Sequence, residues 1–423
     1  MAMHLTTFFG LLGGLLVLAF VANRLARHTG VPDVLVLMAT GIVIGPVLGW
    51  VKASQFEEVT QGFGTLALIL ILFQAGLELD IRETLRHVPR SVLLAILSYG
   101  LSFSLAAEVA RIALGLPFRS ALIAGAVVGC LSSSVVLPVL QQMELSQSLR
   151  ITLIVEASLA DALAVLAVGA LLGLPADGHV AVGDLVSSFF LKVGISLLLG
   201  VLAGVLWSWL LPILAEEQFW HVLTLAAVFL VFAGTGKAGG NDLFAVLIFG
   251  MTLSSFAGYR SKLPRLTFRP DPRAEEHHRQ MLAFHSELGF LVRTFFFVLI
   301  GVVVEFTGLR QYALVSLGIL ASLFLARWLA VEVSSWGWSE IRPAEREIAM
   351  LLFPRGLITA VLALKVVETE GATLGFLPDL AFAIILLTNL LLLLATIRAR
   401  RIETTVVPAG ASEPAPSAPT QAA

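Results

Sequence analysis

The sequence is poor in charged residues and in cysteine. Only 13% of its 423 residues are Asp, Glu, Lys or Arg, whereas soluble domains carry about a quarter. The single cysteine, Cys130, excludes a disulfide within the chain, and its apolar surroundings indicate a small buried side chain. No pattern of nucleophile and base, metal ligands or basic clusters stands out, so the sequence favours neither an enzyme, nor a cofactor-binding protein, nor a nucleic-acid partner.

Apolar residues, in contrast, make up 58% of the chain. Runs long enough to cross a bilayer occur thirteen times, at about 5–24, 32–50, 62–80, 90–115, 119–141, 149–173, 184–213, 219–237, 241–258, 286–306, 309–334, 345–368 and 377–398. We therefore predict an all-α polytopic membrane protein with about thirteen transmembrane helices, surrounded by membrane lipid. Residues 1–401 form the membrane domain, and the Pro-, Ala- and Ser-rich tail 402–423 is expected to be disordered.

The loops predict an orientation. With an odd number of spans the two termini lie on opposite sides, and of the 27 basic residues five fall in loops on the N-terminal side and five within spans, which leaves seventeen on the C-terminal side. The positive-inside rule then makes the C-terminus cytoplasmic and the N-terminus external. Three of the five cations within spans, Lys192, Arg293 and Lys365, are expected to reach the membrane interface with their long side chains, whereas Arg327 and Arg355 lie deeper.

Two acids, Glu156 and Asp161, interrupt the apolar run 149–173. A carboxylate at the bilayer centre raises the free energy of membrane insertion by about 2.5 to 3.5 kcal/mol, so each of the two acids is expected to have a functional or structural role. For Asp161 we favour ion handling over a structural ion pair, because burial favours the protonated acid whereas an arriving metal cation favours the carboxylate.

The spacing of the two acids assigns them separate roles. Five residues turn a helix by about 140°, so Glu156 and Asp161 cannot easily share one ion. Ser158, three residues before Asp161, lies on its face and is expected to supply an oxygen ligand. Glu156 needs a cationic partner, which is either Arg327 or Arg355 on this argument.

The two halves of the chain resemble each other. Gly76 and Gly301 align near the ends of their spans, followed in each half by Asp80 and Glu305 respectively, and Asp161 then aligns with Asn389. Seven spans separate matching helices, which predicts an inverted-topology repeat.

Both halves also contain a polar break inside a span. The first break is Ser132-Ser133-Ser134 with Pro138, and the second is Pro354-Arg355-Gly356. Freed backbone groups are tolerated at this depth only where a helix is buried in protein or lines a cavity. We therefore predict two broken helices that cross near the midplane, beside Asp161.

The motifs described above, with several others, resemble those of a known protein family. Over roughly residues 30–395 the chain resembles the monovalent cation:proton antiporter superfamily, the sodium/proton exchangers and their potassium/proton relatives. The matching segments, in order, are Gly41-x-x-x-Gly45-Pro46, Leu72-Phe73 through Gly76-Leu77-Glu78, Ser132-Ser133-Ser134, Glu156-x-x-x-x-Asp161, Gly239-Gly240 through Gly250, Phe296-Phe297 through Gly301, Arg327 and Arg355-Gly356-Leu357.

The resemblance implies a homodimer in the plasma (inner) membrane that exchanges Na⁺ or K⁺ for protons. A core domain, about 90–173 and 309–398, would move like an elevator against a dimerisation scaffold, about 5–80 and 184–306. Asp161 would bind the ion and the proton, with ligands from Ser132, Ser133 and Ser134, and Glu156 and Arg327 would form a stabilising pair. Two positions depart from the family pattern: Ala160 stands where Asn or Asp is usual, and Ser132-Ser133-Ser134 replaces Thr-Asp-Pro.

Because only one titratable acid is left in the site, we expect electroneutral exchange of one cation for one proton. Fewer strong ligands also favour an easily dehydrated ion such as potassium. Three alternatives stay open: a sodium-coupled transporter of an organic anion anchored by Arg355 and Arg327, a cation channel, and a transport-dead sensor, which Ala160 would suit.

Overall fold

The chain is helical throughout the part that can be described. The structure is a computed structural model, and it describes residues 5–29, 31–51, 57–78, 81–140, 143, 145–173, 182–214, 217–259, 274–303, 306–336, 338 and 341–406. Within those ranges there is no β-strand. Asp80, Glu305 and most of the predicted tail lie outside them, although the last helix continues to Val406, four residues beyond the predicted start of the tail.

The helices account for most of the described residues. In chain order they are α1 (Leu5–Thr29), α2 (Asp33–Ile42) with the π-helical turn η1 (Val43–Val47), α3 (Glu57–Glu78), α4 (Ile81–Leu114), α5 (Phe118–Val128), α6 (Ser133–Leu140), α7 (Gln147–Leu172), α8 (Val182–Leu214), α9 (Trp220–Lys237), α10 (Asp242–Tyr259), α11 (Ala274–Val303), α12 (Phe306–Gln311), α13 (Ala313–Ser335), α14 (Pro343–Leu351), α15 (Leu357–Glu370), the 3₁₀ turn η3 (Gly371–Leu374) and α16 (Leu377–Val406).

Among the described residues, eight segments are long and apolar enough to cross a membrane, judged by length and composition, and one of them combines α5 with α6. Four shorter apolar helices lie within α1, α2 with η1, α3 and α10. The run predicted at 345–368 is divided between α14 and α15. The all-helical, polytopic membrane fold is therefore confirmed, and the number of thirteen crossings stays a prediction.

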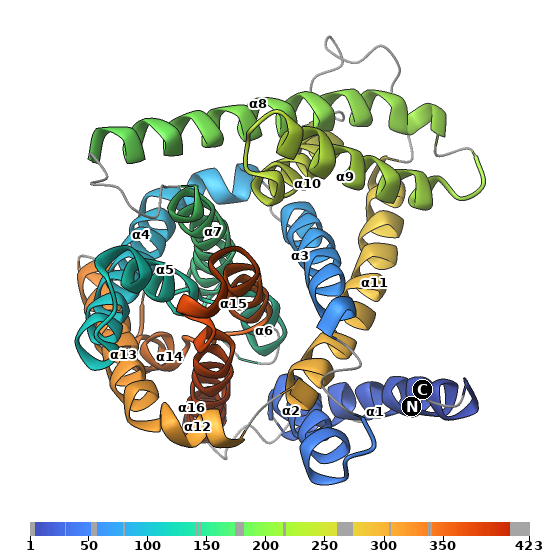
Figure 1. The fold of residues 1–423 in the computed structure, drawn as a ribbon. Helices are drawn as coiled ribbons and strands as arrows, with labels where there is room; N and C mark the ends of the chain where they lie inside the picture. The colour runs from blue at the N-terminus through green and yellow to red at the C-terminus, as the bar shows by residue number, and fades with distance from the viewer. Residues whose placement is uncertain are drawn as a thin grey trace, which may run out of the picture.

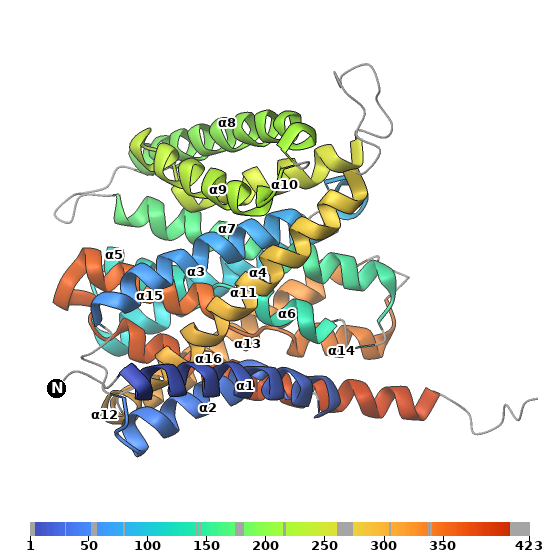
Figure 2. The ribbon, with the colours of Figure 1, turned by 90° about the vertical axis from the view of Figure 1, so that its right-hand side faces the viewer.

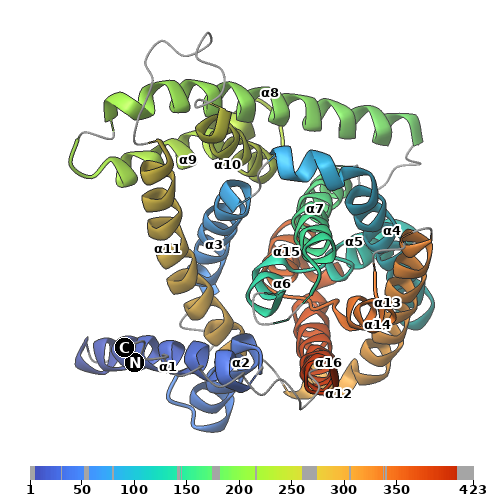
Figure 3. The same ribbon diagram turned by 180° about the vertical axis from the view of Figure 1, so that it is seen from behind.

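Two groups of helices surround the centre of the molecule (Figure 1). In one group α4 packs against α5, α7 and α13, and α15 packs against α16. In the other, α10 packs against α3, α8 and α9, and α11 packs against α2 and α3. Figure 3 shows from behind that α8 runs along one edge of the molecule, while α1 and α2 lie at the opposite edge.

Glycines let two helix pairs approach closely, and the pairs are related by the predicted repeat. A Cβ on Gly76 of α3 would overlap the backbone of α10 at Gly250, and one on Gly41 of α2 would overlap the backbone of α11 at Gly301. Gly76 of α3 aligns with Gly301 of α11 in the repeat. The contact of α3 with α10 therefore corresponds to the contact of α11 with α2. The repeat is thus visible in packing as well as in sequence.

The two predicted breaks are confirmed and meet each other. The first helix stops at Val128 and restarts at Ser133, and the second stops at Leu351 and restarts at Leu357. Pro354 has no backbone N–H and disfavours helix at the residue before it, which explains the second interruption. The amide of Ser132 donates a 3.0 Å hydrogen bond to the carbonyl of Pro354, so the two non-helical segments touch.

Candidate ion-binding site

Asp161 lies halfway along α7, directly beside the first break. Its side chain is 1% exposed. The backbone amide of Ser133 donates to Oδ2 at 3.2 Å, and the Ser133 hydroxyl donates to the same oxygen. The Cys130 thiol donates to Oδ1 at 3.3 Å. The carboxyl group therefore faces the N-terminus of α6, where the partial positive charge of the helix favours an anion.

Arg355 compensates the other helix end at the same break. Its Nε donates a 2.7 Å hydrogen bond to the carbonyl of Val128, the last residue of α5. Its Nη1 donates to the Phe353 carbonyl at 3.1 Å, and the residue is 2% exposed. A buried cation thus offsets the negative end of α5 while Asp161 offsets the positive end of α6.

The three remaining serines predicted to bind the ion differ in their positions. The hydroxyls of Ser132 and Ser134 lie 3.0 Å apart at the break. Ser158 is buried on α7, and its hydroxyl donates to the carbonyl of Ile154 in its own helix at 3.0 Å. The structure therefore joins Ser133 to Asp161 directly. The participation of Ser132, Ser134 and Ser158 as ligands stays a prediction.

Glu156 contacts Arg327, and both side chains are fully buried. The Arg327 Nε also donates to the Ala349 carbonyl at 2.8 Å, and its Nη1 also donates to the Ser98 hydroxyl at 3.2 Å. The pair therefore ties α7 to α4, α13 and α14. Of the two partners that the sequence left open for Glu156, the structure brings Arg327 into contact with it, while Arg355 donates to the backbone around the break.

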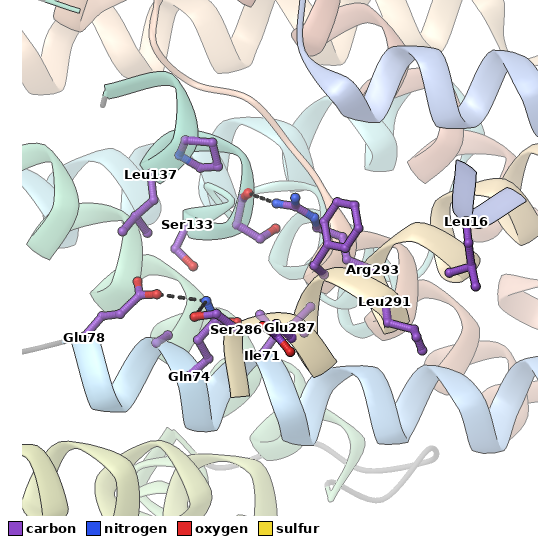
Figure 4. Close-up of a pocket in the computed structure, with 15 residues that line it drawn as sticks. Leu16, Ile71, Gln74, Glu78, Ser133, Leu137, Ser286, Glu287, Leu291 and Arg293 are labelled. Carbon is purple, nitrogen blue, oxygen red and sulfur yellow. Dashed lines mark hydrogen bonds between the residues drawn. The ribbon is translucent and has the colours of Figure 1, made fainter. Parts of the chain in front are cut away.

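A cavity of about 470 Å³ leads to the break from one side of the molecule (Figure 4). Its wall includes Gln74 and Glu78 of α3, Ser133 of α6, and Ser286 and Arg293 of α11. Gln74 donates to Glu78 at 2.8 Å and to the Ser286 hydroxyl at 3.3 Å. The serine that binds Asp161 thus lines an opening whose wall carries both polar and apolar side chains.

On the other side of Asp161 the packing is tighter. Asn241 of α10 donates to the Val165 carbonyl of α7 at 3.2 Å, and Lys192 of α8 donates to the Gly169 carbonyl at 3.3 Å. A cavity of only about 40 Å³ lies near α15 and the start of α16, beside Leu364 and Asp379. The second group of helices therefore closes over the C-terminal half of α7.

Two residues of this site were not expected from the sequence. Cys130 was interpreted only as a small buried side chain, yet its thiol contacts Asp161; its place two residues before Ser132 was the available signal. Arg293 was expected to reach the membrane interface, which stays a prediction, and no contact with the break was expected of it. Its guanidinium binds Asp33 of α2 at 2.9 Å and the Ser134 carbonyl at 2.8 Å.

The arrangement suits a monovalent cation that binds oxygen ligands. A carboxylate, hydroxyl oxygens and freed backbone groups are the ligands that such ions accept when they lose water. The same carboxyl group can hold a proton instead. The described residues contain no group of three or more His, Cys, Asp or Glu side chains that could hold a resident metal.

Comparisons with known proteins agree with this chemistry. Residues 15–401 match the family model described as sodium/hydrogen exchanger, transmembrane. The chain is 25% identical over 374 residues to Na(+)/H(+) antiporter 1 of Methanocaldococcus jannaschii, which covers 86% of this chain and 84% of that protein. It is also 23% identical over 393 residues to the K(+)/H(+) antiporter NhaP2 of Shewanella sp. strain ANA-3, with 90% of this chain and 64% of that protein covered.

A solved structure shares the fold. The structure of the sodium proton antiporter MjNhaP1 from Methanocaldococcus jannaschii at pH 8 matches with a TM-score of 0.75 and 23% sequence identity. The match covers 95% of this chain and 98% of that one. The similar proteins are transporters, which agrees with the absence of an enzymatic motif in the sequence.

Proposed function

Because the chain belongs to the transmembrane sodium/hydrogen exchanger family, we propose that it exchanges a monovalent cation for a proton, with Asp161 as the shared binding site. The observation that carries the proposal is the surroundings of Asp161. This buried acid is held by the amide and hydroxyl of Ser133 and the thiol of Cys130, all neutral groups. Because these neutral groups do not compensate the negative charge of the Asp161 carboxylate, either a proton or a metal cation has to do so.

The cation reaches Asp161 through the 470 Å³ cavity, whose wall includes Ser133. On the opposite side Asn241 and Lys192 close against α7. A protein open to one side and sealed on the other is what alternating access requires. In the proposed cycle, the core formed by α4–α7 and α13–α16 moves relative to a scaffold formed by the remaining long helices, and the protein works as a homodimer.

The proposed orientation places the cavity on the cytoplasmic side of a plasma (inner) membrane. Glu78 lies at the end of α3, just before the arginine-rich first part of α4, and Ser286 of α11 lies at the start of the predicted span 286–306. Under the positive-inside rule both ends face the cytoplasm. The C-terminus then lies inside and the N-terminus outside.

We further propose a stoichiometry of one cation for one proton. Ala160 precedes Asp161 and the break carries Ser132, Ser133 and Ser134, so Asp161 is the single acid at the crossing. Exchange of equal charges makes the cycle electroneutral, and the rate of exchange should be unaffected by an imposed membrane potential at fixed cation gradients. The small number of strong ligands favours potassium over sodium, because potassium is dehydrated more easily.

The competing assignments fit the geometry less well. An organic-anion transporter would need free cationic anchors, but Arg355 donates to the carbonyls of Val128 and Phe353, and Arg327 contacts Glu156. A channel would need a continuous polar pore, whereas the C-terminal half of α7 is covered by α8 and α10. A sensor without transport would show no flux at all.

The test of the proposal is cation-driven proton flux in proteoliposomes, measured with a pH-sensitive dye under sodium, potassium and lithium gradients. Asp161→Asn should abolish the flux, because an amide neither releases a proton nor carries a negative charge. Asp242→Asn is the matched control: Asp242 lies at the start of α10, where its carboxylate accepts from the amide of Leu243 at 2.8 Å. Flux retained in a folded Asp161→Asn protein would contradict the assignment.

A further inference from the structure

The carbonyl of Ser134 lacks the partner that an α-helix would give it. In α6 this carbonyl would accept from the amide of the residue four positions later, which is Pro138, and proline has no N–H. At membrane depth a freed carbonyl needs another donor. Arg293 supplies it, because its Nη1 donates to the Ser134 oxygen at 2.8 Å.

The same guanidinium is held from the other side by Asp33. Nη2 of Arg293 donates to Oδ2 of Asp33 at 2.9 Å, and the two side chains are only 12% and 11% exposed. Oδ1 of Asp33 accepts from the amide of Val34 at 2.9 Å, which fixes the carboxylate at the start of α2. The planar guanidinium therefore bridges two acceptors in a defined geometry.

Asp33 and Arg293 belong to one rigid pair of helices. Gly41 of α2 and Gly301 of α11 are in such close backbone contact that neither position has room for a Cβ. Ser134 belongs to α6, which packs against α7. The hydrogen bond from Arg293 to Ser134 therefore joins the α2–α11 pair to the helices that hold Asp161, at the wall of the cavity (Figure 4).

We propose that Arg293, oriented by Asp33, is a positioning residue that latches the core in the cytoplasm-open state by binding the carbonyl that Pro138 leaves free on Ser134. This inference rests on the proposed antiport function. Ser134 directly follows Ser133, which binds Asp161, so the latch acts one residue away from the ion site. When the core carries Asp161 toward the other side, the bond from Arg293 to Ser134 must break.

The latch differs from a simple electrostatic effect of Arg293 on the arriving cation. In an electrostatic role, only the charges of Arg293 and Asp33 would affect the stability of the cytoplasm-open state. In the latch, the freed carbonyl of Ser134 affects it as well. Pro138→Ala separates the two, because it restores an amide at position 138 that can donate to Ser134 within α6, while both charges remain.

Access from each side can be followed with introduced cysteines and a membrane-impermeant maleimide. Ala75→Cys places a reporter on α3 in the cavity wall, and Leu364→Cys places one on α15 beside the small opposite cavity. Cys130 is fully buried, and its labelling is measured in protein without a reporter and subtracted. The measured quantity is the ratio of the Ala75→Cys labelling rate to the Leu364→Cys labelling rate.

Arg293→Met should lower this ratio about tenfold, the effect of losing one charge-assisted hydrogen bond from one state only. Asp33→Asn and Pro138→Ala should lower it in the same direction by smaller factors. Arg111→Met is the matched control, since Arg111 forms an exposed pair with Glu108 on α4, and should leave the ratio unchanged. If Arg293→Met does not fold, Pro138→Ala and Asp33→Asn decide the question.

Each outcome bears on one claim. A ratio unchanged in Arg293→Met and Pro138→Ala would overturn the latch. A ratio changed in Arg293→Met but not in Pro138→Ala would overturn it in favour of the electrostatic role. If the flux of the parent protein is still abolished by Asp161→Asn, the antiport proposal survives either result; flux retained in Asp161→Asn would instead remove the antiport proposal itself.

Discussion

Asn389 of α16 donates a 2.8 Å hydrogen bond to the carbonyl of Arg355 at the second break. Asp161, which aligns with it in the other half of the chain, accepts a hydrogen bond from the amide of Ser133 at the first break. Figure 2 shows the two broken helices, with α5 and α6 in one and α14 and α15 in the other, within the same layer of the molecule. The repeat thus places one polar side chain at each break, but only the carboxyl group can exchange a proton.

The neutral groups of Ser133 and Cys130 that bind Asp161 should set the affinity of the site for the cation. Ser133→Ala removes the hydroxyl that contacts Asp161 and leaves the amide contact, and it should raise the apparent KM for the cation about tenfold, as expected for loss of one hydrogen bond to a charged group. Cys130→Ala should raise KM less, since a thiol is a weak donor, and Cys130→Ser should retain the wild-type value. Flux measured over a range of cation concentrations checks this. An unchanged KM in Ser133→Ala would remove the serine from the site.

The Glu156–Arg327 pair should govern stability. Glu156→Gln leaves the guanidinium of Arg327 buried without its counter-charge, which should cost about 3 to 5 kcal/mol of unfolding free energy. Adding Arg327→Met should recover part of that loss, because the double variant buries no unpaired charge. Thermal unfolding in detergent compares the single and double variants.

The exposed pair Arg398–Glu347 offers the matched control. Its side chains are 58% and 55% exposed, so Glu347→Gln should change the unfolding free energy by less than about 1 kcal/mol. A double variant at Glu156 and Arg327 that is no more stable than either single variant would contradict the proposed pairing.

A pH effect on stability should come from the outer ends of α5 and α15. Arg119 binds Glu370 through both of its terminal nitrogens, at 2.7 and 2.8 Å, and these hydrogen bonds hold the pKa of the Glu370 carboxyl below its ordinary value. A lowered pKa in the folded state contributes stability above the unfolded pKa and loses it as the pH falls through the folded value. Wild-type protein should therefore lose stability on acidification more than Glu370→Gln does, by about 1 kcal/mol or less. Identical pH dependence of the two melting temperatures would contradict this role.

Much of the fold follows from the sequence because local chemistry dictates it. The apolar runs predict the helices, the serines from Ser132 and the proline Pro354 predict the breaks, and Gly76 and Gly301 predict the repeat, although Pro138 lies inside α6 and not at the break. These features depend on hydrophobicity, missing N–H groups and close backbone approach, which are properties of single residues and their near neighbours.

Other contacts depend on how helices far apart in the chain are placed. Arg293 and Asp33 are separated by 260 positions, and the choice of Arg327 over Arg355 for Glu156 depends on the packing of α7 against its neighbours. The thiol of Cys130 gains its partner only because the chain leaves the helix after Val128 and turns toward α7. Such tertiary contacts leave no periodic signal in the sequence.

The central claim is that one carboxyl group, Asp161, holds either a proton or the cation. Its most direct test is proton release from the purified protein in weakly buffered detergent solution when potassium or sodium chloride is added, with choline chloride as the control for ionic strength. Wild-type protein should release up to about one proton per chain as the cation binds, and Asp161→Asn should release none. Equal release from both proteins, or cation binding to wild-type protein without release, would contradict the account.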